Sequence, residues 1–117
     1  MADIPPRIGK GFPIFEWDDS KAIANWKKHR VSFEAATKVF DDKNAVILPD
    51  LRHSDFEERK RIIGSALDVV SHVRILFVVY VERVKNREGR VIRIISARDA
   101  NKEEAKIYER GLSSRIS

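Results

Sequence analysis

Five side chains suited to acid-base and phosphate chemistry stand close together in the middle of the chain. They are Arg52, His53, Glu57, Glu58 and Arg59. Histidine titrates near neutral pH and can take or give a proton, while arginine holds a phosphate through paired hydrogen bonds. Such a set suffices for transfer of an RNA 2′-hydroxyl onto its own phosphate, in which a base removes the hydroxyl proton and an acid protonates the leaving 5′-oxygen. The competing interpretation is a solvated loop with local ion pairs.

A second concentration of arginines follows toward the C-terminus and contains Arg83, Arg93 and Arg98. The stretch from Arg83 to Arg98 holds six basic residues and one acid, a net charge of +5, which equals the formal net charge of the whole chain. Clustered positive charge is typical of a protein that binds phosphate groups. Arg93 lies within an apolar run and therefore needs a partner. That partner is either a bound phosphate or a carboxylate, for which Glu82 and Asp99 are the candidates.

Other chemistries find less support in the sequence. The chain has no cysteine, which excludes disulfides and thiolate chemistry. No phosphate-binding glycine loop, zinc-protease motif or serine-hydrolase motif is present, and His29, His53 and His72 do not have metal-ligand spacing. We therefore expect neither a metal nor a cofactor. No apolar run approaches the roughly 18 residues of a membrane span, so we expect a cytoplasmic protein without membrane contact.

Several aromatic and basic residues admit two interpretations. Trp17 and Trp26 stand beside apolar helix positions, which favours the core over stacking on bases. Tyr80 lies in the middle of an apolar strand and is expected to be buried, unless its hydroxyl reaches a cleft beside Arg83. His29 follows two lysines near a predicted helix end, where capping of the last carbonyl groups is the more frequent role.

The elements that must position these residues change in type along the chain. Prolines and glycines near the start predict a flexible arm over residues 1–13, followed by a single domain over residues 14–117. The expected order is strand, two helices, four strands and helix, which is an α+β arrangement. The strands are expected at 14–17, 45–48, 60–66, 72–83 and 90–97, and the helices from Asp18–Ser20 to about Arg30, from Ser32 to about Phe40, and from Asn101 to Gly111.

The third of the four later strands constrains the architecture most. From Val73 to Val81 both alternating sets of residues are apolar, which predicts a strand covered on both faces. Residues 86–89 are expected to form a hairpin loop, which predicts that this strand is antiparallel to the next. Three helices suffice to cover one face of such a sheet, so we expect apolar sheet surface to remain for a partner.

Short stretches in a characteristic order carry a resemblance to a known family. They are Phe15–Asp18, Asn25 with Lys28–His29, Val31–Glu34, Arg52–Ser54 with Glu57–Arg59, Ile63–Gly64, Val79–Tyr80 with Glu82–Arg83, and Arg93–Arg98. Over residues 14–110 the chain thereby resembles the BrnT toxin family. The resemblance implies a RelE-like microbial ribonuclease fold, for which we expect an antiparallel sheet with two N-terminal helices and one C-terminal helix. It also implies inhibition of translation through RNA cleavage.

Together with the residue analysis, the resemblance implies a set of site residues and partners. The expected catalytic residues are His53, Glu58, Arg59, Arg83, Arg93 and Arg98. The expected RNA-binding residues are Lys27, Lys28, His29, Arg52 and Tyr80. The expected partners are an RNA substrate and a BrnA-type antitoxin with a ribbon-helix-helix part, in a 2:2 complex that binds operator DNA only through the antitoxin. The alternatives are a non-catalytic nucleic-acid-binding module and a partner-binding module.

Overall fold

The computed structural model describes residues 13–49, 59–67, 72–84 and 89–116. Its elements are β1 (Ile14–Glu16), α1 (Asp19–His29), α2 (Phe33–Thr37), the 3-10 helix η1 (Lys38–Asp41), β2 (Val46–Pro49), β3 (Arg59–Leu67), β4 (Val73–Val84), β5 (Arg90–Asp99) and α3 (Lys102–Ile116). This order confirms the predicted α+β arrangement. The predicted arm, apart from Pro13, lies outside the described residues. So does the predicted hairpin loop, except for Gly89, whose φ of 103° is the positive value that such a loop requires.

The strands form one five-stranded sheet in the order β1-β5-β4-β3-β2. Strands β2 to β5 pair with one another in antiparallel fashion, but β1 runs parallel to β5. The expectation of an antiparallel sheet is therefore wrong for β1. Parallel neighbours need a long connection between them, and here every element of the described residues except α3 lies between β1 and β5 along the chain. A strand of three residues gives no local sign of which partner it will find across that distance.

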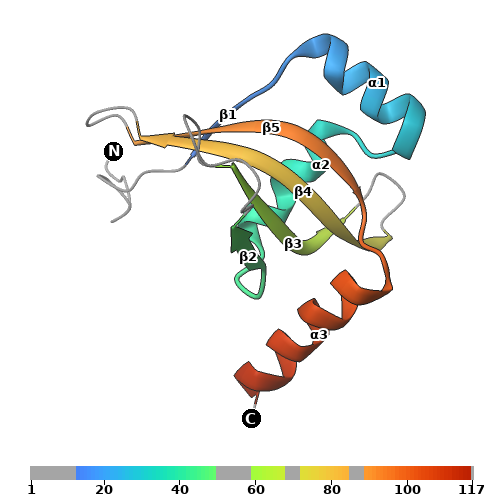
Figure 1. Ribbon diagram of the computed structural model, residues 1–117, viewed down its shortest axis with the longest axis vertical. Coiled ribbons are helices and arrows are strands. Elements are labelled where there is room, and N and C mark those ends of the chain that lie inside the picture. Colours follow the sequence, from blue (N-terminus) through green and yellow to red (C-terminus); the bar gives the residue numbers. More distant parts are fainter. Residues whose placement is uncertain (1–12, 50–58, 68–71, 85–88, 117) are drawn as a thin grey trace.

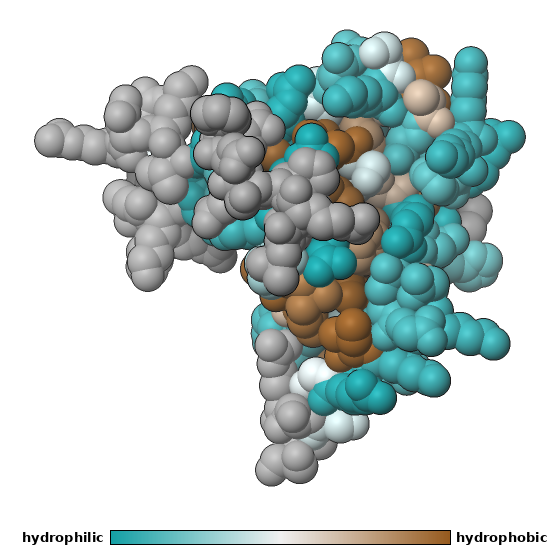
Figure 2. Space-filling view, viewed as in Figure 1, coloured by the Kyte–Doolittle hydropathy of each residue, from teal (hydrophilic) through white to brown (hydrophobic). Residues whose placement is uncertain are grey.

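Helices cover both faces of the sheet, but unequally. α1 and α2 pack against one face, which we call the helical face (Figure 1). The buried core of this face consists of Val31, Phe33, Ala36, Val39, Ile62, Ala66, Leu76, Val78, Tyr80, Ile92, Ile94 and Ala97. α3 packs against the opposite face around a smaller core of Ile63, Phe77 and Tyr108. Figure 2 shows the hydrophobic side chains that gather between the sheet and α3. Strand β4 is thus apolar on both sides, as predicted.

The helix starts follow the predicted capping residues. The side chain of Asp18 accepts backbone N–H bonds at the start of α1. The Ser32 hydroxyl caps α2 with a 3.0 Å hydrogen bond from the backbone three residues on. At α3 the exchange is reciprocal, because Asn101 Oδ1 accepts from Glu104 N at 2.8 Å while Glu104 Oε1 accepts from Asn101 N at 2.9 Å. None of the helices in the described part of the chain is long and apolar enough to span a membrane.

The end of α3 differs from the prediction. The helix continues through Gly111 to Ile116, so glycine does not stop it there. Position 111 requires a small residue because α3 packs closely against β2. A Cβ at this position would lie 3.3 Å from Cγ2 of Val46. Gly111 therefore lets α3 approach the sheet closely.

A buried asparagine fixes α1 to the sheet. Asn25 Nδ2 donates to the carbonyls of Val31 and Ala97 at 2.9 and 2.8 Å, and its Oδ1 accepts from Ala97 N at 3.1 Å. Because successive helical residues are about 100° apart, the next residue, Trp26, falls on the outer side and is 46% exposed. The prediction of a core position is confirmed for Trp17, which packs against that core, and wrong for Trp26.

Candidate active site

The four predicted catalytic arginines, Arg59, Arg83, Arg93 and Arg98, project from the face of the sheet opposite α1 and α2. Residues that pair directly across neighbouring strands project from the same face. Arg59 of β3 pairs with Val81 of β4. Val81 pairs in turn with Arg93 of β5, and Arg93 with Glu16 of β1. Arg83 follows Val81 by two residues and so projects from the same face. We call this side of the sheet the arginine face. Its arginines are Arg59, Arg61, Arg83, Arg93 and Arg98.

Glu16 lies between two of these arginines. Arg83 Nη2 and Arg93 Nη1 both donate to the same carboxylate oxygen, Glu16 Oε2, and the Arg93 distance is 3.3 Å. The side chains of Arg83, Arg93 and Glu16 are 55%, 39% and 37% exposed, so solvent and solutes reach them. Three strands build this contact. Two guanidinium groups that converge on one anionic oxygen form an arrangement that can hold a phosphate oxygen.

Arg98 is engaged by α3. Its Nη1 and Nη2 donate to the two carboxylate oxygens of Glu104 at 2.9 and 3.0 Å, and its guanidinium carbon lies 4.3 Å from the centre of the Phe77 ring. Burial by itself would raise the pKa of Glu104, but hydrogen bonds from Arg98 and Asn101 outweigh burial and hold that pKa below its ordinary value. Arg98 therefore ties the start of α3 to the sheet and is less available to a phosphate than Arg83 or Arg93.

The carboxylates expected beside Arg93 have other partners. Glu82 projects from the helical face, and Asp99 accepts two hydrogen bonds of 2.9 Å from Arg74. Arg93 was expected to pair with a phosphate or with a carboxylate. In the structure it pairs with a carboxylate, but that carboxylate belongs to Glu16 and not to Glu82 or Asp99. The reason is directional, since Arg93 projects away from the face on which Glu82 lies.

Among the described residues, the predicted RNA-binding residues lie away from the arginine face. Tyr80 is 1% exposed and packs edge-on against Phe40, with 4.9 Å between ring centres. Burial, followed by the charge of Glu82, raises the pKa of Tyr80 to about 12. The structure therefore corrects the expected RNA contact, because the Tyr80 ring is buried under η1 on the helical face, whereas Arg83 projects from the arginine face. The other described candidates, Lys27–His29, form the last turn of α1 on the helical face.

The remaining candidates lie outside the described residues. They are Arg52, His53 and Glu58. Arg59 is the first described residue after them and begins β3. Through Val81 of β4 it belongs to the row of cross-strand neighbours that continues with Arg93 and Glu16. The roles expected of His53 and Glu58 thus stay predictions.

Glu16 is the residue that sequence reasoning missed. It lies in the stretch Phe15–Asp18 that carries the family resemblance, but its significance depends on the parallel pairing of β1 with β5. The only local signal is an acid in a short apolar strand. A charge in such a strand must find a partner, as was argued for Arg93.

The sequence model of one protein family matches residues 17–104, more than half of the chain. That family is described as the ribonuclease toxin, BrnT, of type II toxin-antitoxin systems. The chain belongs to the BrnT toxin family. A BrnT toxin is a ribonuclease, and membership in a type II system implies a protein antitoxin as partner. A search of curated protein sequences gives no match.

The matched region of this BrnT chain includes all five arginines of the arginine face. Glu16 precedes the first matched residue by one position. The ribonuclease assignment and the arginine face therefore concern the same part of the chain. What the arrangement offers chemically is a pair of half-exposed cations that share one anion.

Proposed function

We propose that this BrnT toxin cleaves RNA on the arginine face without a metal ion, and that Arg83 and Arg93 hold the phosphate of the cleaved bond. The observation that supports the proposal is the shared contact with Glu16 Oε2. A phosphate presents several anionic oxygens to the same two guanidinium groups and competes for them with a single carboxylate. RNA cleavage in the cytoplasm then stops translation.

The reaction we propose is an internal transfer. A base takes the proton of the RNA 2′-hydroxyl, the 2′-oxygen attacks the phosphorus, the bond to the 5′-oxygen breaks, and an acid protonates that oxygen. The products are a 2′,3′-cyclic phosphate and a 5′-hydroxyl. Arg83 and Arg93 stabilise the negative charge that grows on the phosphate oxygens in the transition state.

His53 and Glu58 are our candidates for the acid and the base. They precede Arg59 by six residues and by one residue, and Arg59 stands in the row with Arg93. A segment of six residues spans at most about 20 Å, so the chain limits the distance of both residues from Arg59 to that value. Arg59 then adds a third cation beside the phosphate.

Glu16 has the role of a counterion in this proposal. In the absence of RNA it neutralises part of the charge of Arg83 and Arg93. A bound phosphate replaces it, because two anions that share one site repel each other. The exposure of Glu16 allows the carboxylate to turn into solvent when that happens.

The partner we propose is a BrnA-type antitoxin with a ribbon-helix-helix part. Membership in the family supports an antitoxin of protein nature. A ribbon-helix-helix protein is a dimer, so it carries two toxin chains in a 2:2 complex and contacts operator DNA itself.

The test of the cleavage mechanism is an assay with purified toxin and single-stranded RNA in the presence of a chelator. We expect cleavage to continue and to leave 2′,3′-cyclic or 3′-phosphate ends. Activity that is lost in chelator and restored by a divalent cation would overturn the mechanism. Expression of the chain alone in bacteria should also arrest growth and shorten cellular RNA.

A further inference from the structure

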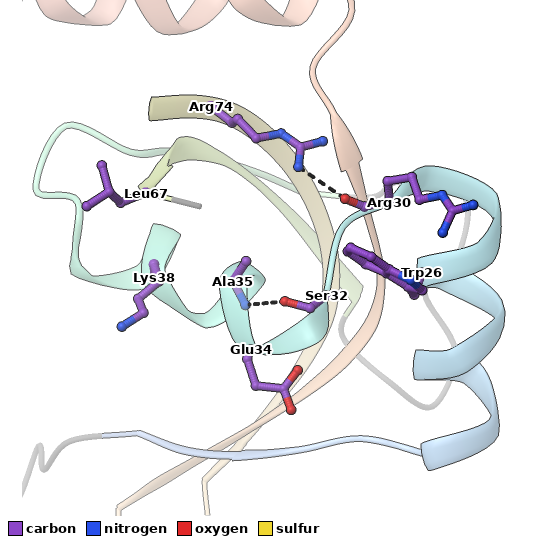
Figure 3. Close-up of a pocket in the computed structure, with 8 residues that line it drawn as sticks. All are labelled: Trp26, Arg30, Ser32, Glu34, Ala35, Lys38, Leu67 and Arg74. Atoms are coloured by element: carbon purple, nitrogen blue, oxygen red, sulfur yellow. Dashed lines mark hydrogen bonds between the residues drawn. The ribbon is translucent and has the colours of Figure 1, made fainter. Parts of the chain in front are cut away.

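A groove lies between the two N-terminal helices and the ends of β3 and β4, on the helical side of the sheet (Figure 3). Its volume is about 560 Å³, and its lining residues are Trp26, Arg30, Ser32, Glu34, Ala35, Lys38, Leu67 and Arg74. A cavity of this size accepts one or two large side chains of a partner. None of the arginines of the arginine face lines it.

Two of the large apolar side chains that are exposed among the described residues line this groove, and a third lies one helical turn away. Trp26 and Leu67, which line it, are 46% and 56% exposed. Ile23, one turn before Trp26 on α1, is 58% exposed. One exposed apolar side chain is ordinary, but a group of them around a cavity marks an interaction site. Tryptophan is also enriched among the residues that anchor such sites.

The rim of the groove is basic. Arg74 is held by Asp99 and by the carbonyl of Arg30, which the dashed line in Figure 3 marks. Arg30 itself lies over the Trp26 ring, with 5.6 Å between guanidinium carbon and ring centre. Arg30 and Lys38 thus outnumber the single acid of the lining, Glu34. An apolar floor with a positive rim fits an amphipathic segment that presents a large apolar side chain flanked by carboxylates.

We propose that this groove binds such a segment of the antitoxin, so that the antitoxin anchors on the helical side of the toxin, away from Arg83 and Arg93. The proposal rests on the proposed antitoxin partner but not on the proposed RNA chemistry. A strand of RNA fits the groove less well, because its affinity comes from many phosphate contacts and the floor here is apolar. The location also differs from the sequence-based expectation of a partner on uncovered sheet, since α3 covers part of that surface.

The experiment measures three properties of each purified variant: the Kd for the purified BrnA-type antitoxin, the Kd for a short single-stranded RNA, and the cleavage rate. The groove variants are Trp26→Ala, Leu67→Ala and Lys38→Glu. The matched controls are Ile47→Ala, which is also 56% exposed in a strand, and Lys106→Glu on the exposed side of α3. All five positions lie at the surface, so circular dichroism should show unchanged folding.

We expect Trp26→Ala and Leu67→Ala to weaken antitoxin binding at least about tenfold, the loss typical of an interface anchor. Lys38→Glu should weaken it less and reduce its dependence on salt. The controls should bind as the unaltered toxin does, and every variant should cleave RNA at the unaltered rate.

Groove variants that bind the antitoxin as tightly as Ile47→Ala overturn the proposal. Groove variants that lose RNA affinity instead also overturn it, because the groove is then an RNA surface. If the unaltered toxin cleaves no RNA while the groove variants bind the antitoxin more weakly than the controls, the proposed ribonuclease mechanism is refuted and the proposed antitoxin site in the groove is supported.

Discussion

Glu82 on the helical face and Glu16 on the arginine face each lie between two basic side chains, yet they bind them differently. Glu82 uses one oxygen for each cation, with Oε1 3.5 Å from Lys60 Nζ and Oε2 2.7 Å from Arg90 Nε, and its side chain is 19% exposed. Glu16 offers one oxygen to both arginines and is 37% exposed. A shielded carboxylate with both oxygens in use serves the fold. A shared oxygen at the surface leaves guanidinium hydrogens for a second anion.

The largest predicted effect is on RNA cleavage, which should depend on arginines of the arginine face and not on an arginine of the helical face. Arg83→Ala or Arg93→Ala should reduce RNA cleavage by about 100-fold, as removal of a transition-state hydrogen-bond donor does. Arg90→Ala, which removes an arginine from the helical face, should change cleavage by less than about threefold after correction for the folded fraction. Initial rates on a labelled RNA oligonucleotide measure this.

A second pair of controls lies at the predicted hairpin tip. Lys85→Ala and Arg87→Ala remove positive charge close to Arg83 along the chain but outside the described residues. We expect them to cost less than Arg83→Ala. Equal losses at all of these positions would mean diffuse electrostatic attraction and no defined phosphate site.

The converse experiment changes stability and leaves the chemistry intact. Asn25→Ala should lower the free energy of unfolding by about 3 kcal/mol, because it leaves the backbone groups of Ala97 and Val31 unsatisfied in the core. Urea denaturation measures the loss, and cleavage per folded molecule should be unchanged at low temperature. A stable Asn25→Ala protein with impaired cleavage would show that the helical face takes part in the reaction.

The smallest predicted effect is on RNA affinity and comes from Glu16, the carboxylate that Arg83 and Arg93 share. Glu16→Gln keeps the size of the side chain and removes its charge, so RNA should bind about two- to fivefold more tightly, in line with the strength of an exposed ion pair. Fluorescence anisotropy with an RNA whose 2′-hydroxyl groups are methylated, and which therefore lacks the attacking hydroxyl, measures this. Glu16→Asn, which is shorter, is the companion variant. If binding tightens while cleavage disappears, Glu16 is the general base and not a counterion.

Features that depend on near neighbours could be predicted from the sequence. Asp18, Ser32 and Asn101 mark the helix starts, since a cap acts on backbone groups within three residues of itself. The alternating pattern from Val73 to Val81 likewise revealed a strand that packs against a core on each face from Leu76 onward, because side-chain direction alternates strictly along a strand. The need of Arg93 for a partner also followed from its own apolar surroundings.

Features that depend on distant segments could not be predicted. The partner of Arg93 is Glu16, 77 residues earlier, and it meets Arg93 only because β1 joins the sheet in parallel beside β5. Trp26 has apolar neighbours in sequence, but the side of α1 that faces the sheet is set by Asn25 and its bonds to β5. In the sequence, Gly111 is typical of a residue that ends a helix. Its role in packing depends on Val46 of β2, which is distant along the chain.

Glu104 caps the start of α3 and also holds Arg98, and this double use restricts which sequences the position tolerates. Glutamine keeps an oxygen for the N–H of Asn101 but cannot accept both hydrogen bonds from the guanidinium group. Aspartate keeps the charge on a side chain one methylene shorter. A change at position 104 thus disturbs a helix start and an arginine together, so we expect substitutions at 98 and 104 to occur as a pair during divergence of related chains.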